Sequence, residues 1–163
     1  MASQEDMEKW RHEGFDAVLT ASDGESPRGI FRGTHELYFD EPEYVDIGED
    51  EHPCPHDYLL ATVGGCQLET LKQCLEKGRV DEYDIEIQVE SKKGKVEVAD
   101  DMPGTADIRI TDIHTDITVE VPPGHEPRAS RCLDIFEAHC PISQSVDAGV
   151  TLHTSDTLAV EDS

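Results

Sequence analysis

The sequence predicts a single α+β domain, built in the order strands, helix, strands, helix, strand. Two amphipathic segments, residues 53–78 and 126–140, carry apolar residues at helical spacing. The segments around and between them alternate apolar and polar residues, which is the pattern of half-buried strands. Strands that follow one another without a helix between them favour mainly antiparallel pairing. With 163 residues, the chain is long enough for one domain over residues 1–163 with a sizeable core.

The N-terminal part of the chain predicts two or three strands. Residues 1–12 are a polar lead-in to a strand-like stretch at Glu13–Ala21. Residues 22–27 contain the Gly and Pro that are typical of a turn. Alternation over Arg28–Asp40 predicts one or two further strands, and residues 41–52 have the composition of an acidic loop.

The segment Pro53–Gly78 predicts a helix of five or six turns. Pro55 stands where a proline of the first helical turn is tolerated, and Gly78 stands where a helix commonly ends. One face of this helix is apolar, which predicts that it packs against the core. The apolar residues that recur at helical spacing are Leu60, Leu68, Leu71 and Leu75.

Two adjacent glycines stand in the middle of this predicted helix. Gly64 and Gly65 each cost the helix about 1 kcal/mol relative to alanine. A sequence can carry that cost where another part of the backbone or a reacting ligand must come close. Cys66 follows directly and falls on the buried-facing side. The pattern therefore points to a cysteine beside a site of close approach.

The chain after this helix predicts a second group of strands. Asp84–Glu90 alternates apolar and acidic residues, which indicates a half-buried strand. Ser91–Gly104 is charged and glycine-rich, and we expect a hairpin turn around Lys93–Gly94. Ala106–Val121 predicts one long strand or two.

The C-terminal part predicts a second helix and a last strand. Glu126–Cys140 has an apolar face at helical spacing. Pro141 disfavours helical geometry at the residue before it, so the helix should end there. Gly149–Val160 has the character of a final strand.

Negative charge is the most unusual property of the whole chain. Asp and Glu number 37 against 13 Lys and Arg, which gives a net charge of −24. This charge repels nucleic acid and anionic membranes and argues against both as partners. The periodic apolar segments favour a folded protein with a carboxylate-covered surface, as expected for a halophile. Without an apolar run of membrane-spanning length or a signal peptide, we expect it to be cytoplasmic.

The five cysteines are Cys54, Cys66, Cys74, Cys132 and Cys140. An odd number in a chain expected to be cytoplasmic argues against a structural disulfide framework. Redox chemistry, metal binding and simple burial remain as explanations. Cys74 and Cys132 lie on helix faces without polar company, so core packing is favoured for both.

Two motifs carry a resemblance to a known family. Leu-Leu-Ala-Thr-Val-Gly-Gly-Cys ends at Cys66, and Cys-Pro-Ile-Ser-Gln-Ser begins at Cys140, 74 residues later. Together they resemble the OsmC/Ohr family (osmotically inducible protein C and organic hydroperoxide resistance proteins), roughly over Arg28–Val160. The resemblance implies an OsmC-like fold, in which mainly antiparallel sheets wrap around central helices in an intertwined homodimer. It also explains the paired glycines as a place of close approach.

The activity that the resemblance implies is a thiol-dependent peroxidase for organic hydroperoxides. Cys66 would be the peroxidatic cysteine and Cys140 the resolving one. The chemistry is sound, because a thiolate attacks the peroxide and the resulting sulfenic acid condenses with a nearby thiol. Apolar helix faces around Cys66 favour a hydrophobic peroxide. An external dithiol would then reduce the disulfide, and no metal or nucleotide cofactor is needed.

The peroxidatic thiolate would need a positive group beside it. Cys66 lies too deep in its helix to benefit from the helix dipole, so a nearby cation must lower its pKa. The resemblance implies an arginine from an N-terminal strand or loop, held by a glutamate. Arg32 is preferred over Arg28 because it lies in the alternating segment. His56 stands where many members have that glutamate, so Asp57 is the candidate to hold the arginine.

Two alternatives remain beside the peroxidase. The chain could be a non-enzymatic member of the family that binds an apolar ligand or senses redox state. Alternatively, His52, Cys54 and His56 alternate with prolines in a pattern that could hold zinc or another metal.

Overall fold

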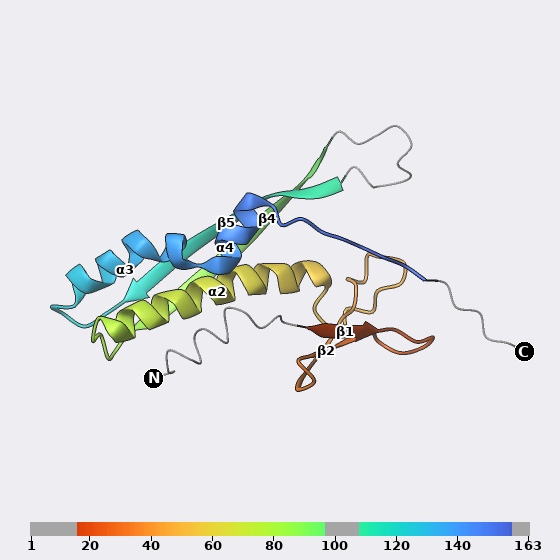
Figure 1. The fold of residues 1–163 in the computed structure, drawn as a ribbon, viewed down its shortest axis with the longest axis horizontal. Helices are drawn as coiled ribbons and strands as arrows, with labels where there is room; N and C mark the ends of the chain where they lie inside the picture. The colour runs from red at the N-terminus through yellow and green to blue at the C-terminus, as the bar shows by residue number, and fades with distance from the viewer. Residues whose placement is uncertain (1–15, 97–107, 158–163) are drawn as a thin grey trace, which may run out of the picture. The chain divides into compact units, whose positions relative to one another are not determined.

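The computed structural model describes residues 16–96 and 108–157 and has the α+β architecture that the sequence predicts. Its described strands form two antiparallel sheets (Figure 1). The chain divides into two compact units, with the boundary between Leu59 and Leu60 in the helix α2 (Pro55–Lys77). The polar lead-in at residues 1–12 lies outside the described residues.

The first unit contains a three-stranded antiparallel sheet. Its strands are β1 (Ala17–Thr20), β2 (Arg28–Phe31) and β3 (His35–Tyr38), and β2 lies between the other two. The tight turn from β2 to β3 uses positive φ angles at Arg32 (50°) and Gly33 (64°). Of the one or two strands predicted within residues 28–40, the structure has two, and Arg32 belongs to the turn between them.

A single aspartate organises the acidic loop that follows this sheet. Asp40 Oδ1 accepts hydrogen bonds from the backbone N–H of Glu41 (2.7 Å) and Glu49 (3.3 Å). Its Oδ2 accepts another from the N–H of Glu51 (2.9 Å). These bonds, that of Glu51 first, hold the pKa of Asp40 below its ordinary value. The carboxylate thus fastens both ends of the loop to one point.

The second unit is built on a long two-stranded sheet. After most of α2 come β4 (Asp84–Lys95) and β5 (Ile108–Glu120), which pair antiparallel along their whole length (Figure 1). Two helices follow, α3 (Glu126–His139) and α4 (Pro141–Ala148). The predicted bounds of the first helix are confirmed, since α2 begins at Pro55 and stops one residue before Gly78.

The core of the second unit lies between its helices and one face of the sheet. Leu71 and Leu75 of α2 are 0% exposed, and so is Val80 just after it. Alternate side chains of β4 and β5 pack against this cluster, because successive residues of a strand face opposite sides of the sheet. Those half-buried strand residues are Ile85, Ile87, Ile117 and Val119.

The paired glycines of α2 have different surroundings. A Cβ on Gly64 would lie 2.8 Å from Cγ2 of Val89 on β4, so the bare backbone allows the strand to pack closely. A Cβ on Gly65 would meet nothing within 4 Å of this chain. Close approach thus explains Gly64 within one chain.

The expected hairpin turn around Lys93–Gly94 is wrong. Both residues lie in β4 and pair with Ile110 and Arg109 of β5, after a shift in register between Lys92 and Lys93. The residues of β4 that pack on the core cluster, Ile85 and Ile87, lie toward its other end, whereas the backbone pairing continues to Lys95. The connection to β5 at residues 97–107 lies outside the described residues.

The end of the described chain also differs from the prediction. Pro141 does end the preceding helix, since Cys140 is extended (φ −86°, ψ 105°), but it also begins α4. Proline is well suited to a first helical position because it has no N–H to leave unpaired. The expected strand at Gly149–Val160 is absent over residues 149–157, where the described chain gives it no strand to pair with.

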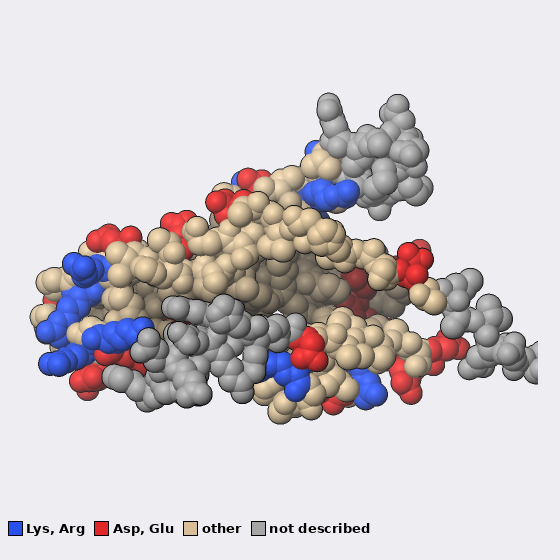
Figure 2. Space-filling view, in the orientation of Figure 1, with Lys and Arg blue, Asp and Glu red and all other residues tan. Residues whose placement is uncertain are grey.

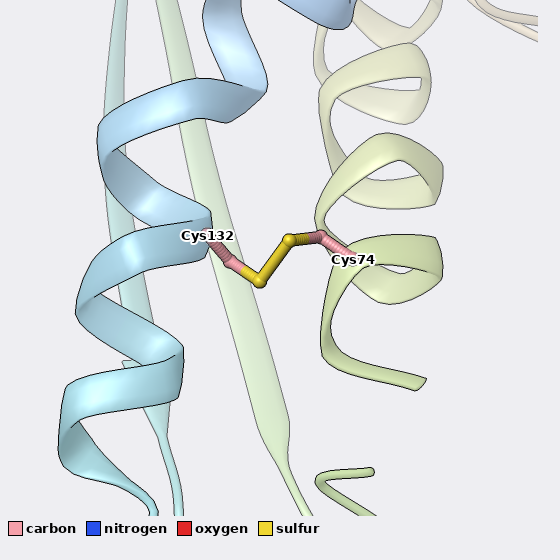
Figure 3. Close-up of a disulfide and its surroundings, with 2 residues drawn as sticks. All are labelled: Cys74 and Cys132. Atoms are coloured by element: carbon pink, nitrogen blue, oxygen red, sulfur yellow. A yellow bond between two sulfur atoms is a disulfide. The ribbon is translucent and has the colours of Figure 1, made fainter. Parts of the chain in front are cut away.

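A disulfide joins the helices α2 and α3. Cys74 and Cys132 are bonded through their sulfur atoms, with a Cα–Cα distance of 5.7 Å (Figure 3). The expectation that these cysteines only pack in the core is therefore wrong. Their helix faces lack polar company, as predicted, but that pattern cannot reveal that two separate faces meet.

No described helix is long and apolar enough to cross a membrane.

Candidate dithiol site

The two cysteines of the sequence motifs meet in the second unit. Cys66 projects from α2 and Cys140 from the junction of α3 and α4, and their Sγ atoms are 3.1 Å apart. Cys140 is 0% exposed, whereas Cys66 is partly exposed. Of the two, Cys66 is therefore the thiol that a molecule from solvent reaches first.

The helix pair brings these thiols together through a regular register. Cys74 follows Cys66 by eight residues on α2, and Cys132 precedes Cys140 by eight residues at the end of α3. Because the bonded pair and the free pair are equally spaced along both segments, they are two successive cysteine–cysteine contacts between antiparallel elements, of which one is a disulfide. The disulfide thus fixes the register in which the free thiols face each other.

The Cys140 sulfur receives a hydrogen bond from a neighbouring hydroxyl. Ser143, on the first turn of α4, donates from Oγ to Cys140 Sγ at 3.1 Å. The same Oγ accepts a hydrogen bond from Nε2 of Gln67, also at 3.1 Å. Gln67 is 6% exposed and directly follows Cys66 on α2. A chain of hydrogen bonds therefore runs from a buried amide to the thiol pair.

The surroundings shift the pKa values of the two thiols in opposite directions. Burial has the largest effect on each and by itself raises the pKa. The pKa of Cys66 is raised, because the hydrogen bond with Cys140 adds to burial. The pKa of Cys140 is lowered, because hydrogen bonds from Ser143, Cys66 and the backbone of Ile142 outweigh burial. Without a further positive charge, the pair thus carries its first negative charge on Cys140.

The candidate arginines both lie in the first unit. Arg32 stands in the turn after β2, where its backbone N–H donates to the carbonyl of Asp16. Arg28 begins β2, and its guanidinium forms an ion pair with Glu36 on the next strand at 3.2 Å. The role of Arg32 beside Cys66 stays a prediction.

Asp57 has a local structural role at the start of α2. Its Oδ2 accepts a hydrogen bond from the backbone N–H of Cys54, the residue before the helix, at 2.9 Å. An acidic side chain in the third helical position commonly reaches back in this way. The role of Asp57 as the holder of an arginine stays a prediction.

The three residues of the possible metal motif have different local surroundings. His52 stacks on the ring of Tyr38, with centroids 5.2 Å apart. Cys54 is a partly exposed free thiol, and His56 lies in the first turn of α2. Within the described ranges, no three His, Cys, Asp or Glu side chains are grouped to hold a metal ion.

Sequence reasoning missed Ser143 and Gln67. Both stand inside the quoted motifs or directly beside them, since Gln67 follows Cys66 and Ser143 is three residues after Cys140. A polar residue at a core-facing helical position, which Gln67 occupies, was the available signal. Its partner could not be named because the hydrogen bond joins residues 76 positions apart.

The fold and site together define an α+β protein with a dithiol site held between helices. Residues 48–155, more than half of the chain, match the model of the family described as OsmC-like protein. The chain therefore belongs to the OsmC-like protein family. Comparison with curated protein sequences gives no significant match.

Solved structures show the same fold at low sequence identity. An OsmC-like protein from Mycoplasma pneumoniae has a TM-score of 0.65 and 14% identity, covering 85% of this chain and 90% of its own. An OsmC-like protein of unknown function from Vibrio cholerae has a TM-score of 0.64 and 15% identity, covering 83% and 95%. An organic hydroperoxide resistance protein OsmC from Legionella pneumophila has a TM-score of 0.58 and 12% identity, covering 83% and 90%.

Proposed function

We propose that this protein is a thiol-dependent peroxidase that reduces organic hydroperoxides in defence against oxidative stress. The observation that carries the proposal is the 3.1 Å separation of the Cys66 and Cys140 sulfurs. A disulfide bond is about 2.05 Å long, so a relative movement of about 1 Å would join them. Membership of the OsmC-like family supports a redox role, as does the likeness to the organic hydroperoxide resistance protein from Legionella pneumophila.

The reaction runs in three balanced steps. The Cys66 thiolate attacks the outer peroxide oxygen, which breaks the O–O bond, forms the Cys66 sulfenic acid and releases an alkoxide that takes up a proton to become the alcohol. Cys140 then attacks the sulfenic sulfur, and water leaves as the Cys66–Cys140 disulfide forms. An external dithiol reduces this disulfide and is itself oxidised. One peroxide and one dithiol thus give alcohol, water and oxidised dithiol.

Exposure supports this order of attack. Cys66 is partly exposed and Cys140 is fully buried, so peroxide meets Cys66 first and Cys140 is held behind it. The raised pKa of Cys66 disfavours its thiolate, so the first step requires a cation that reverses this preference. Arg32 is the proposed cation, and Asp57 is its proposed holder.

The proposed enzyme is a homodimer with one domain per chain. The family match begins before Leu59 and ends far beyond it, which supports one domain across both compact units. Val18 and Leu19 are neighbours on β1, so they face opposite sides of its sheet, and both are 62% exposed. A sheet with apolar residues uncovered on both faces needs a cover, which a second copy would supply. Light scattering in molar salt measures this directly.

The space-filling view is consistent with an acidic protein that also has uncharged surface. Figure 2 shows acidic and basic side chains close to one another at several places on this face, with wide areas of other residues elsewhere. The net charge of −24 argues against nucleic acid and anionic membranes as partners. The cytoplasm, where dithiol reductants are present, is the proposed location.

Turnover with a hydroperoxide tests the proposal. Wild-type protein is mixed with cumene hydroperoxide and a lipoyl-type dithiol in molar salt, and loss of peroxide is followed. We expect many turnovers from wild type, none from Cys66→Ser, and strongly reduced turnover from Cys140→Ser. Cys54→Ser is the matched control, since Cys54 is a free thiol outside the pair, and it should keep full activity.

Two outcomes would contradict the peroxidase. Equal activity of Cys66→Ser and wild type would remove the thiol from the reaction. Oxidation of Cys66 once per chain, with no reduction by dithiols of any tested size, would instead support a redox sensor.

A further inference from the structure

The hydrogen bonds around Cys140 fix the direction of one proton. A serine hydroxyl has one proton to donate and can accept two hydrogen bonds. Ser143 Oγ already accepts from Gln67 Nε2, an amide nitrogen that can only donate. The remaining partner at hydrogen-bond distance is Cys140 Sγ, so the Ser143 proton points at the sulfur. The hydroxyl is therefore arranged to stabilise a negative sulfur.

Gln67 is placed to hold that hydroxyl in position. It is 94% buried by its 6% exposure, and its Oε1 has no hydrogen-bond partner among the described atoms. Burial of an amide with one end unpaired costs free energy, and a core position would more commonly hold an apolar residue. A role for its Nε2 in orienting Ser143 explains why an amide is present there.

The remaining groups around Cys140 point the same way. The titratable group that faces its sulfur is the Cys66 thiol on α2, and Ile142 and Ser143 on α4 contribute uncharged donors. On α3, the neighbour in sequence is His139, for which no direct contact with the sulfur is observed. The start of α4 adds backbone N–H groups directed at the residue that precedes the helix.

We propose that Ser143, oriented by the buried amide of Gln67, holds Cys140 ready as the thiolate that attacks oxidised Cys66. Ser143 touches a reacting sulfur and is in that sense catalytic, whereas Gln67 acts through Ser143 and is a positioning residue. The bond that forms is Cys140 Sγ–Cys66 Sγ, and hydroxide leaves the sulfenic sulfur and is protonated to water. This inference gives roles to residues of the proposed peroxidase site and so rests on the proposed function.

A titration that needs no peroxidase activity tests the stabilisation itself. In a Cys54→Ser, Cys66→Ser background, Cys140 is the remaining free thiol, and its ionisation is followed by thiolate absorbance near 240 nm. Ser143→Ala should raise the Cys140 pKa by about one unit, which corresponds to the loss of one hydrogen bond to a charged group. Gln67→Leu should shift it in the same direction by less. An unchanged pKa in both variants would overturn the inference.

Two variants separate the effect from general damage to the fold. Ser145→Ala removes an exposed hydroxyl on the same helix and should leave the Cys140 pKa unchanged. Ser143→Thr keeps a hydroxyl at the site and should restore most of the shift. If Thr fails to restore the shift while the variant melts like its background, the hydroxyl is not the cause.

Single-turnover kinetics test the catalytic consequence. With Cys66 present, stopped-flow mixing with peroxide separates formation of the sulfenic acid from closure of the disulfide. Ser143→Ala should slow closure about tenfold at pH 7 and move its pH profile up by about one unit, with the first step unchanged. If Cys66 does not react with peroxide at all, the proposed function fails, whereas the titration still decides the role of Ser143. A slower first step with normal closure would overturn the assignment.

Discussion

The disulfide between Cys74 and Cys132 should contribute a large share of the stability of the chain. The bond closes a loop over a sequence separation of 58 residues. The chain-entropy model gives about 4 kcal/mol at 25 °C for a loop of that length, because the cross-link restricts the unfolded chain. Most small domains are stable by only about 5–15 kcal/mol, so the loss should be easy to measure.

The assay must isolate this bond from the other thiols. Cys54, Cys66 and Cys140 are replaced by serine, so that the Cys66–Cys140 bond cannot form and add its own constraint. Guanidinium unfolding in molar salt is then compared for the oxidised protein, the same protein after reduction, and a version with Cys74→Ala and Cys132→Ala. We expect the free energy of unfolding of the reduced protein and of the alanine version to be about 4 kcal/mol lower than that of the oxidised protein.

Reduction and replacement by alanine are two ways to remove the disulfide, and the comparison between them is the internal control. Reduction keeps both sulfur atoms in the core, whereas alanine removes them, so alanine should cost slightly more. Equal free energies of unfolding before and after reduction would refute the reasoning. That result would mean one of two things. Either residual structure already holds the segments of α2 and α3 close together in the unfolded ensemble, or the bond strains the folded state.

Three further predictions concern packing, pH and salt. Gly64→Ala should destabilise the fold by about 1–3 kcal/mol, because its Cβ would lie 2.8 Å from Val89 Cγ2. Gly65→Ala would meet nothing in this chain and should stabilise the fold by about 1 kcal/mol. Equal effects of the two variants in denaturant unfolding would refute the contrast. Asp40 has a lowered pKa in the folded state, so its stabilisation is full above the unfolded value near 3.8 and is lost as pH falls through the folded value. Asp40→Asn should thus be less stable than wild type at pH 6, and the difference in melting temperature should vanish in acid. With a net charge of −24, the protein should melt at a lower temperature as salt is dialysed away, and a flat melting temperature up to molar salt would contradict the expected halophilic surface.

Local patterns determined the elements that depend on nearby residues. The apolar spacing within residues 53–78, with a proline at one end and a glycine at the other, was enough to define α2. Clean alternation over residues 84–90 was enough for the first part of β4. The turn placed at Lys93–Gly94 was wrong because strand pairing with β5 overrides the local turn signal.

The sequence by itself determined the motif cysteines, the family resemblance and the negative surface, because each can be read from residue types and their spacing. Only the tertiary structure decided which sulfurs meet: Cys66 lies beside Cys140, and Cys74 is bonded to Cys132. It also revealed the contact between Gln67 and Ser143. The physical reason is that these contacts depend on the register of two packed helices, and a register is fixed by the whole core rather than by any one segment.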